Sequence, residues 1–284
     1  MNQTREDDVA VRQFYETYGW QRGSSGQYRD AEAFVDLRPV MDGYHRRRDQ
    51  RVARLLAGEG PLLDLGCGGA PVPVAADGGL RVNLDFAAAA LRGARQTLGD
   101  TASYLQADIC QLPFPADTFG RVLCAHVLYH LTPERQTLAL TEICRVLRPG
   151  GVAVLVYIQT FARLQNLARR LRLDSRPVAD LPPLPYHPVD HRRLQVGLRD
   201  RARIEVRSWS ILAPEITRTV VPGGRAGRAM VAGVAAVEDH LPRWSARLAR
   251  YPMLIVRKSR SHDDPPTHGD RPETPPRSEG GQAL

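Results

Sequence analysis

The stretch Pro61–Ala70, PLLDLGCGGA, is the part of the sequence from which the fold is best predicted. Leu62–Leu65 is a short apolar run broken by Asp64, and it predicts a buried strand that leads directly into a glycine-rich turn. Because glycine has no Cβ, such a turn lets the backbone approach a ligand closely. Asp64 is placed to accept hydrogen bonds from an ammonium group or from the amides of the turn.

A second acid, Asp85, ends the apolar run Leu80–Leu84 and lies 21 residues after Asp64. An acid at this separation from a glycine turn is expected at the end of the next parallel strand, where it can bind ribose hydroxyls. Alone, the pattern fits an NAD site or any other adenosine site. It also fits a turn between two core strands that binds no ligand.

The chain of 284 residues, 43% of them hydrophobic and 25% charged, is long enough for one large domain or two small ones. The N-terminus is charged and lacks an apolar signal core, and the longest apolar run, Val152–Ile158, is too short to span a bilayer. We therefore expect a cytoplasmic protein with no membrane partner.

The four cysteines have no C-x-x-C spacing, so the sequence predicts neither a zinc site nor a redox motif, and no metal. Cys67 lies in the glycine turn, where it is either a reactive thiol or a small apolar residue. The net charge of +8 comes almost entirely from arginine, since Lys258 is the single lysine. The arginines are scattered and aromatic content is 6%, which disfavours a nucleic-acid partner and favours a solvated basic surface.

Strands and helices are expected to alternate along the middle of the chain, which predicts a parallel sheet built from right-handed βαβ units. The expected strands are 62–65, 80–85, 103–107, 121–126 and 152–157. The expected helices are 9–18, 44–56, 72–76, 86–98 and 133–147. Ligands bind beyond the carboxyl ends of such strands. That rule brings the glycine turn, Asp85, Asp108 and the segment after His126 to one edge of the sheet.

Five segments follow one another in order: LLDLGCGGA, VNLD, ADICQLPFPADTF, VLYHL and EICRVLRPGG. Together they resemble the class I S-adenosylmethionine-dependent methyltransferases, and most closely the subgroup of small-molecule enzymes that includes the quinone methylases. The resemblance covers about residues 61–157. It is specific for the superfamily and says little about the substrate.

The resemblance implies S-adenosylmethionine as cofactor, in a site made by Asp64, Gly66, Cys67, Gly68, Asp85, Phe86, Asp108, Ile109 and His126. Within it, the turn would hold the methionine end and Asp85 the ribose hydroxyls. Asp108 and Ile109 would bind the adenine, and His126 would lie beside the methionine. Two departures from the family pattern stand out: Ala70 replaces a third glycine, and Phe119-Gly120-Arg121 stands where the family has Phe-Asp.

The resemblance also implies a Rossmann-like, doubly wound α/β fold with a seven-stranded sheet, mostly parallel with the last strand antiparallel. Strands at 204–212 and 251–258 would close it. We expect a helical N-terminal extension or lid over 1–57 and a methyltransferase domain over 58–258. Cover segments would fall at about 159–203, beginning with a helix over 160–173, and at 213–250. The polar, proline-rich residues 259–284 are expected to form a disordered tail.

Transfer of a methyl group from a sulfonium needs alignment and desolvation, and it needs a general base only where the acceptor must lose a proton. His126 and His130 are the candidates for such a base; the alternative is that they pack or cap the loop. Tyr15, Tyr18 and Trp20 form either a lid over the cofactor or a helix on the sheet edge. Tyr129 and His187 are further candidates for contact with the substrate.

The sequence lacks three patterns that mark other substrates: [DN]-P-P-[YF] after the fourth strand, a Pro-Cys pair, and an acidic cluster for a metal-dependent catechol site. We therefore predict methylation of a small molecule at oxygen or nitrogen, in secondary metabolism, by a monomer or homodimer. Two alternatives remain open. One is an RNA or protein methyltransferase that uses the basic surface, and the other is a relative that binds the cofactor without catalysis.

Overall fold

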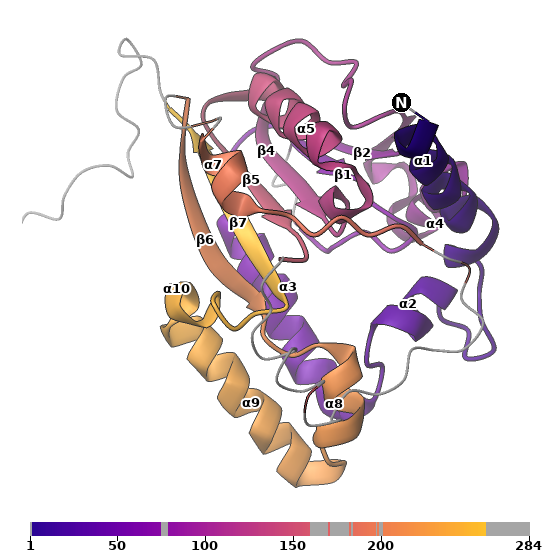
Figure 1. The fold of residues 1–284 in the computed structure, drawn as a ribbon, viewed down its shortest axis with the longest axis vertical. Coiled ribbons are helices and arrows are strands. Elements are labelled where there is room, and N and C mark those ends of the chain that lie inside the picture. The colour runs from indigo at the N-terminus through magenta and orange to yellow at the C-terminus, as the bar shows by residue number, and fades with distance from the viewer. Residues whose placement is uncertain are drawn as a thin grey trace, which may run out of the picture.

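A sheet of seven strands, in the order β3-β2-β1-β4-β5-β7-β6, forms the centre of the molecule (Figure 1). The computed structural model describes residues 2–74, 79–159, 184–196 and 201–259, together with residues 170, 182 and 198. The strands are β1 (Leu62–Leu65), β2 (Arg81–Asp85), β3 (Ser103–Gln106), β4 (Phe119–Ala125), β5 (Leu147–Val156), β6 (Ala202–Ser210) and β7 (Tyr251–Lys258). β7 runs antiparallel to both neighbours, whereas the other pairs are parallel. The predicted fold class is confirmed.

Helices cover both faces of this sheet (Figure 1). They are α1 (Asn2–Phe14), α2 (Arg29–Phe34), α3 (Asp42–Leu55), α4 (Ala88–Leu98), α5 (Pro133–Val146), α7 (His191–Val196), α8 (Pro214–Val220), α9 (Gly224–His240) and α10 (Pro242–Ser245). None of the helices in the described ranges is both long enough and apolar enough to cross a membrane.

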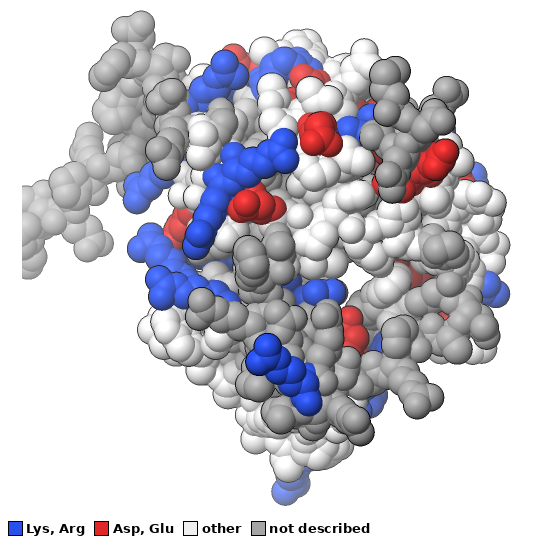
Figure 2. Space-filling view, viewed as in Figure 1, with Lys and Arg blue, Asp and Glu red and all other residues white. Residues whose placement is uncertain are grey.

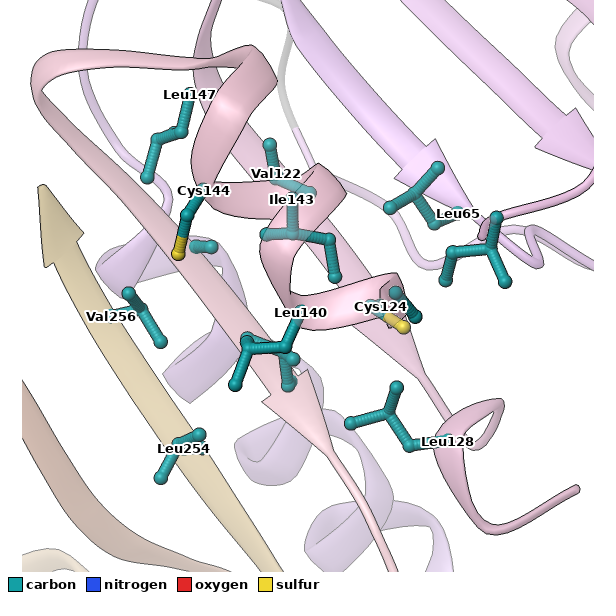
Figure 3. Close-up of a cluster of buried hydrophobic side chains, with 14 of the residues drawn as sticks. Leu65, Val122, Cys124, Leu128, Leu140, Ile143, Cys144, Leu147, Leu254 and Val256 are labelled. Atoms are coloured by element: carbon teal, nitrogen blue, oxygen red, sulfur yellow. The ribbon is translucent and has the colours of Figure 1, made fainter. Parts of the chain in front are cut away.

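The two faces of the sheet carry separate apolar clusters because successive strand residues point to opposite sides. On one face, Leu140 and Ile143 of α5 pack against Val122 and Cys124 of β4 (Figure 3). On the other face, α3 contributes Val52 to a cluster that contains Leu123, the residue between those two. Burial on both faces explains why the central strands read as continuous apolar runs rather than as alternating patterns.

A smaller cluster joins the start of α3 to α9, and it is made by Val40, Met41, Tyr44, Val221, Val231 and Ala235. Beside it, Arg51 pairs with Glu238 at 2.7 Å, and both side chains are buried. Figure 1 shows α8 and α9 below the sheet, and α3 runs from behind the sheet down to them. Residues of α3 and α8 line one side of the cavity described below.

Most expected elements are present with shifted ends, but the structure differs from expectation in two places. Residues 71–74 are not helical, so the helix predicted over 72–76 is wrong for residues 72–74. Two prolines in this short stretch remove backbone donors, which disfavours a helix there. Between the helices expected over 9–18 and 44–56, the structure has a further short helix, α2, which begins at Arg29. The expected helix over 160–173 and the expected tail fall almost wholly outside the described residues.

Arg121 explains the departure from Phe-Asp at the start of β4. Its buried guanidinium donates to the carbonyl oxygens of Leu56, at 3.3 Å, and Gly60, at 2.8 Å. These carbonyls lie at the end of α3 and in the loop before β1. The arginine therefore fixes the entry to the first strand from the neighbouring one.

Candidate functional site

The chain continues from β1 to β2 on one side and later to β4 on the other, so the strand order reverses at β1. The glycine turn after β1 lies at this point, which is where open α/β sheets bind ligands. Gly66 and Gly68 have φ of +62° and +64°, a region that residues with a Cβ rarely adopt. A Cβ on Gly68 would lie 2.5 Å from the indole of Trp20. Both positions therefore require glycine, and the turn presents bare backbone beneath an aromatic ring.

Asp85 holds this turn from the end of β2. Its carboxylate accepts hydrogen bonds from the amides of Gly68, at 3.0 Å, and Ala87, at 2.9 Å. Burial raises the pKa of Asp85 to about 6, although these two amide donors partly offset the rise. Phe86 follows it and also lines the cavity. Asp85 thus lies between two loops that both belong to the predicted cofactor site.

Asp64 is buried and pairs with Arg81 of β2, whose Nη2 lies 2.7 Å from its Oδ2. Burial raises the pKa of Asp64 to about 6, and Arg81 lowers it in part. Arg81 also donates to the carbonyl oxygen of Val72, so it ties the turn to the segment that follows. Arg81 was not among the predicted site residues. A charged residue at the start of a buried apolar strand, next to the strand that carries Asp64, could have indicated this ion pair.

Asp108 follows β3 and is held by two donors. It accepts from the amide of Cys110, at 2.8 Å, and from Nη2 of Arg135 in α5, also at 2.8 Å. Burial acts to raise the pKa of Asp108, but these hydrogen bonds leave it below its usual value. Arg135 further pairs with Asp8 of α1 at 3.5 Å. Ile109 is buried beside them, so the predicted adenine end is also the place where α1 joins the domain.

Three aromatic side chains follow β4 and lie at the centre of the cavity: His126, Tyr129 and His130. His126 has a φ of +64°, a conformation that is uncommon for a residue with a side chain and that recurs at functional sites. Burial lowers the pKa of His126 to about 3 and that of His130 to about 4. Both rings are therefore neutral at physiological pH. Nδ1 of His130 lies 3.4 Å from the carbonyl oxygen of Pro185, so it carries the proton, and Nε2 is the nitrogen with the lone pair.

The N-terminal segment crosses the same edge of the sheet. After α1 the backbone forms a π-helix over Tyr15–Gly19, a rare geometry that is common at functional sites. The Tyr15 hydroxyl lies 3.1 Å from Nε2 of His130, and its ring stacks on Trp20 with centroids 5.7 Å apart. Glu16 accepts from the amides of Ala88 and Ala89 at the start of α4. The segment therefore bridges the ends of β2 and β4.

A cavity of about 1220 Å³ joins these groups. Every residue predicted to hold the cofactor lines it, as do Tyr15, Trp20, Tyr129 and His130. Two predicted substrate contacts do not. Tyr18 packs against Phe14 and under the guanidinium of Arg29, and His187 lies 3.0 Å from Asp7 of α1. Both side chains tie the N-terminal segment together rather than face the cavity.

The far end of the cavity contains residues that the sequence analysis did not single out, and they come from α2, α3, α8, β6 and β7: Asp30, Arg48, Trp209, Glu215, Arg250 and Tyr251. These residues belong to no common sequence motif, so no local pattern indicates that they meet. Cys67 also lines the cavity, but it is buried and its pKa is raised, first by burial and then by Asp64 and Asp85. Its thiol is therefore unreactive.

Residues 63–155 match the family model described as a methyltransferase domain. The chain is 31% identical over 148 residues to a probable methyltransferase, ltbC, of Aspergillus luteorubrus, a match that covers 45% of this chain and 52% of that protein. It is 33% identical over 115 residues to the ubiquinone/menaquinone biosynthesis C-methyltransferase UbiE of Coxiella burnetii, with 39% and 43% covered.

Residues 63–155 are therefore a methyltransferase domain, and the predicted resemblance to the class I S-adenosylmethionine-dependent methyltransferases is confirmed for this part of the chain. The chain spans about half the length of the curated relatives it matches. Among solved structures, magnesium protoporphyrin IX methyltransferase from Synechocystis, with bound SAH, superposes with a TM-score of 0.54 over 89% of this chain and all of that one, at 16% identity. At this identity the likeness supports the methyltransferase fold alone.

The residues present suit the cofactor of the family. The turn that only glycine can form and the buried acceptor Asp85 meet at the switch point of the sheet, and the cavity passes over both. A nucleoside needs such an acceptor for its ribose hydroxyls and bare backbone for the groups that lie against the turn. S-adenosylmethionine is the cofactor of this class.

Proposed function

We propose that this protein transfers a methyl group from S-adenosylmethionine to oxygen or nitrogen of a small molecule, in a pathway of secondary metabolism. The observation that carries the proposal is the cavity of about 1220 Å³ that extends from the glycine turn to an aromatic far end. Sites for single small ligands measure roughly 300–1,000 Å³. This cavity therefore has room for the cofactor and for an acceptor of modest size beside it.

At the cofactor end, we assign the backbone of Gly66 and Gly68 to the methionine moiety and Asp85 to the ribose hydroxyls. Asp64 would act through the turn, because Arg81 already occupies its carboxylate. Asp108 would accept from the exocyclic amine of the adenine, with Ile109 against the ring. Trp20 and Tyr15 would exclude water above the turn, which favours transfer because charge is dispersed as the sulfonium loses its methyl group.

At the reacting centre, the cofactor supplies a methyl carbon activated by the sulfonium. The protein residues supply position and, where needed, a proton acceptor. His130 is neutral and already exchanges a hydrogen bond with Tyr15, so it would accept the proton of a hydroxyl acceptor. His126 packs against the rings of Trp209 and Tyr251, at 4.7 and 5.2 Å, and would position the acceptor. An unprotonated amine needs no base.

The two alternatives make different demands on the structure. A concentrated basic patch beside the cavity would favour an RNA or protein methyltransferase. Figure 2 shows Lys and Arg spread over the face in view and interspersed with Asp and Glu. A cofactor end closed by Ala70 or Pro71 would favour a relative without catalysis. Ala70, Pro71 and Asp85 all line the same cavity, which does not favour a closed cofactor end.

Calorimetry with S-adenosylmethionine and S-adenosylhomocysteine tests the cofactor site. We expect micromolar binding to the wild type, a loss of at least tenfold in Asp85→Asn, and no change in Asp100→Asn, whose side chain is 91% exposed. Incubation with methyl-labelled cofactor and a cell extract split by size then tests the acceptor class. Label in the small-molecule fraction supports the proposal, and label in RNA or protein supports the first alternative. Binding without transfer supports the second.

A further inference from the structure

A continuous series of aromatic rings, here called the aromatic wall, runs along the cavity from the cover over the glycine turn to its far end. It comprises Tyr15, His130, Tyr186, Tyr129, His126, Tyr251 and Trp209. Successive rings in this order have centroids 5.2–6.1 Å apart. Its members come from the N-terminal segment, the end of β4, residues 184–190, β6 and β7. The faces of such rings attract cations.

Two carboxylates lie beside this wall. Asp30 of α2 lines the cavity with Tyr15, and its charge acts on Tyr15, Tyr129 and Tyr186. Glu215 of α8 acts on Tyr186 and Tyr251, and its Oε2 is buried without a hydrogen-bond partner. Within the described ranges, neither acid forms an ion pair. Both residues are half-buried, but Oε2 of Glu215 is fully shielded from solvent. A shielded carboxylate oxygen without a counter-charge is costly, so its presence at a cavity indicates a ligand that supplies one.

The other charged groups at this end compensate one another. Arg48 lies over Trp209 and pairs with Asp49, and Asp36 pairs with Arg38. Burial lowers the pKa values of His45, His126 and His130 to about 4, 3 and 4, so these rings are neutral. Arg250 lies over the Tyr251 ring at 5.9 Å, and Arg12 lines the cavity one turn before Tyr15 but is exposed to solvent. Beside the wall itself, the two acids therefore outnumber Arg250.

On the basis of the proposed function, we infer that the methyl acceptor is a small amine that enters as an ammonium ion, received by Asp30 and Glu215 against the aromatic wall. Arg250, whose Nε is buried without a partner, is left to donate to an oxygen of the same ligand. The wall contributes the cation–π attraction, and the two acids contribute the counter-charge that the protein itself lacks.

This arrangement also solves a chemical problem. An ammonium ion has no lone pair, so it must lose a proton before its nitrogen can attack the methyl carbon. Asp30, which is ionised once the ammonium ion lies beside it, is the group that takes that proton as the nitrogen attacks. The nitrogen then bonds to the methyl carbon while the carbon–sulfur bond breaks and its electron pair stays on sulfur. Charge and atoms balance without a metal or redox partner.

Three matched probes test the inference on the full chain saturated with S-adenosylhomocysteine: 2-phenylethylamine, 2-phenylethanol and 3-phenylpropionate. They share one ring and differ in charge. We expect the amine to bind at least tenfold more tightly than the alcohol, and the carboxylate more weakly than either. Asp30→Asn and Glu215→Gln should each reduce this preference to threefold or less. Asp100→Asn should keep it.

Proton release provides a second readout. Because an ammonium ion beside Asp30 lowers its pKa, binding of the amine at pH 7 should release protons, seen as a calorimetric enthalpy that varies with the ionisation enthalpy of the buffer. The alcohol should release none. Equal affinity for amine and alcohol, or no binding of either by a protein that binds S-adenosylhomocysteine, overturns the inference and leaves the proposed function standing. Failure to bind S-adenosylhomocysteine overturns the proposed function itself.

Discussion

The hydroxyl oxygen of Tyr15 lies 3.1 Å from Nε2 of His130, 115 residues further along the chain. This contact joins the N-terminal segment to the end of β4 above the cavity. Asp30 lines the same cavity and its charge acts on Tyr15, so the Tyr15 side chain connects the cover of the site with its neutral histidine beside a carboxylate.

Tyr15→Phe should loosen this cover while keeping its ring stacked on Trp20. Loss of a hydrogen bond of this kind costs about 0.5–1.5 kcal/mol, which corresponds to roughly a two- to tenfold change in rate. We expect S-adenosylhomocysteine to dissociate faster by that factor in stopped-flow fluorescence. Tyr18→Phe is the matched control, because Tyr18 does not line the cavity. Equal dissociation rates in the two variants would show that the contact does not hold the cover.

Gly68→Ala should weaken cofactor binding by more than tenfold, because the new Cβ would lie 2.5 Å from the Trp20 ring and would force it away. Gly26→Ala separates this contact from backbone strain. Gly26 has a φ of +78° and nothing within 4 Å of an added Cβ, so only the strain of about 1 kcal/mol applies. Calorimetry measures cofactor affinity and thermal unfolding measures stability, for both single variants and for the double variant Gly68→Ala with Trp20→Ala. Recovery of affinity in the double variant is expected.

Arg81→Met should destabilise the protein by about 3–5 kcal/mol, since it leaves the Asp64 carboxylate buried without a partner. Adding Asp64→Asn should recover part of this loss, because no charge then remains. Arg95→Met, which breaks an exposed pair with Asp100, should cost less than about 1 kcal/mol. Urea unfolding of the four proteins measures the free energies. A cost for Arg81→Met no greater than that for Arg95→Met would contradict the structural role of the buried pair.

Asp30→Asn should stabilise the free protein above pH 7. The pKa of Asp30 is about 7 in the folded state against an ordinary value of 3.8, so the folded state binds more protons between pH 4 and pH 7. The stability contributed by Asp30 therefore falls as pH rises through this window. The gain from Asp30→Asn should be near zero at pH 4 and reach at most about 4 kcal/mol at pH 8.

Other groups titrate in the same range, and the comparison of variant with wild type removes them. Asp64 and Asp85 have raised pKa values and change stability in the same direction as Asp30. His126 and His130, with lowered pKa values, lose stability as pH falls. A difference between Asp30→Asn and wild type that does not change from pH 4 to pH 8 would show that Asp30 is not buried in the free protein.

The sequence by itself determined the sheet, the glycine turn and the acids that follow β1, β2 and β3. These features depend on local rules: apolar runs form buried strands, positive φ requires glycine, and the carboxyl ends of parallel strands meet at one edge. For this reason Gly66, Gly68 and Asp85 could be placed in one site before their contacts were known.

Only the tertiary structure decided which side chains meet across the cavity. Arg81 reaches Asp64 because of the register of two strands, and Arg135 reaches Asp108 from a helix 27 residues later. Asp30, Glu215 and Tyr251 converge from three elements that share no motif and no spacing. Such contacts follow from packing over long separations, and a local pattern of residue types carries no information about them.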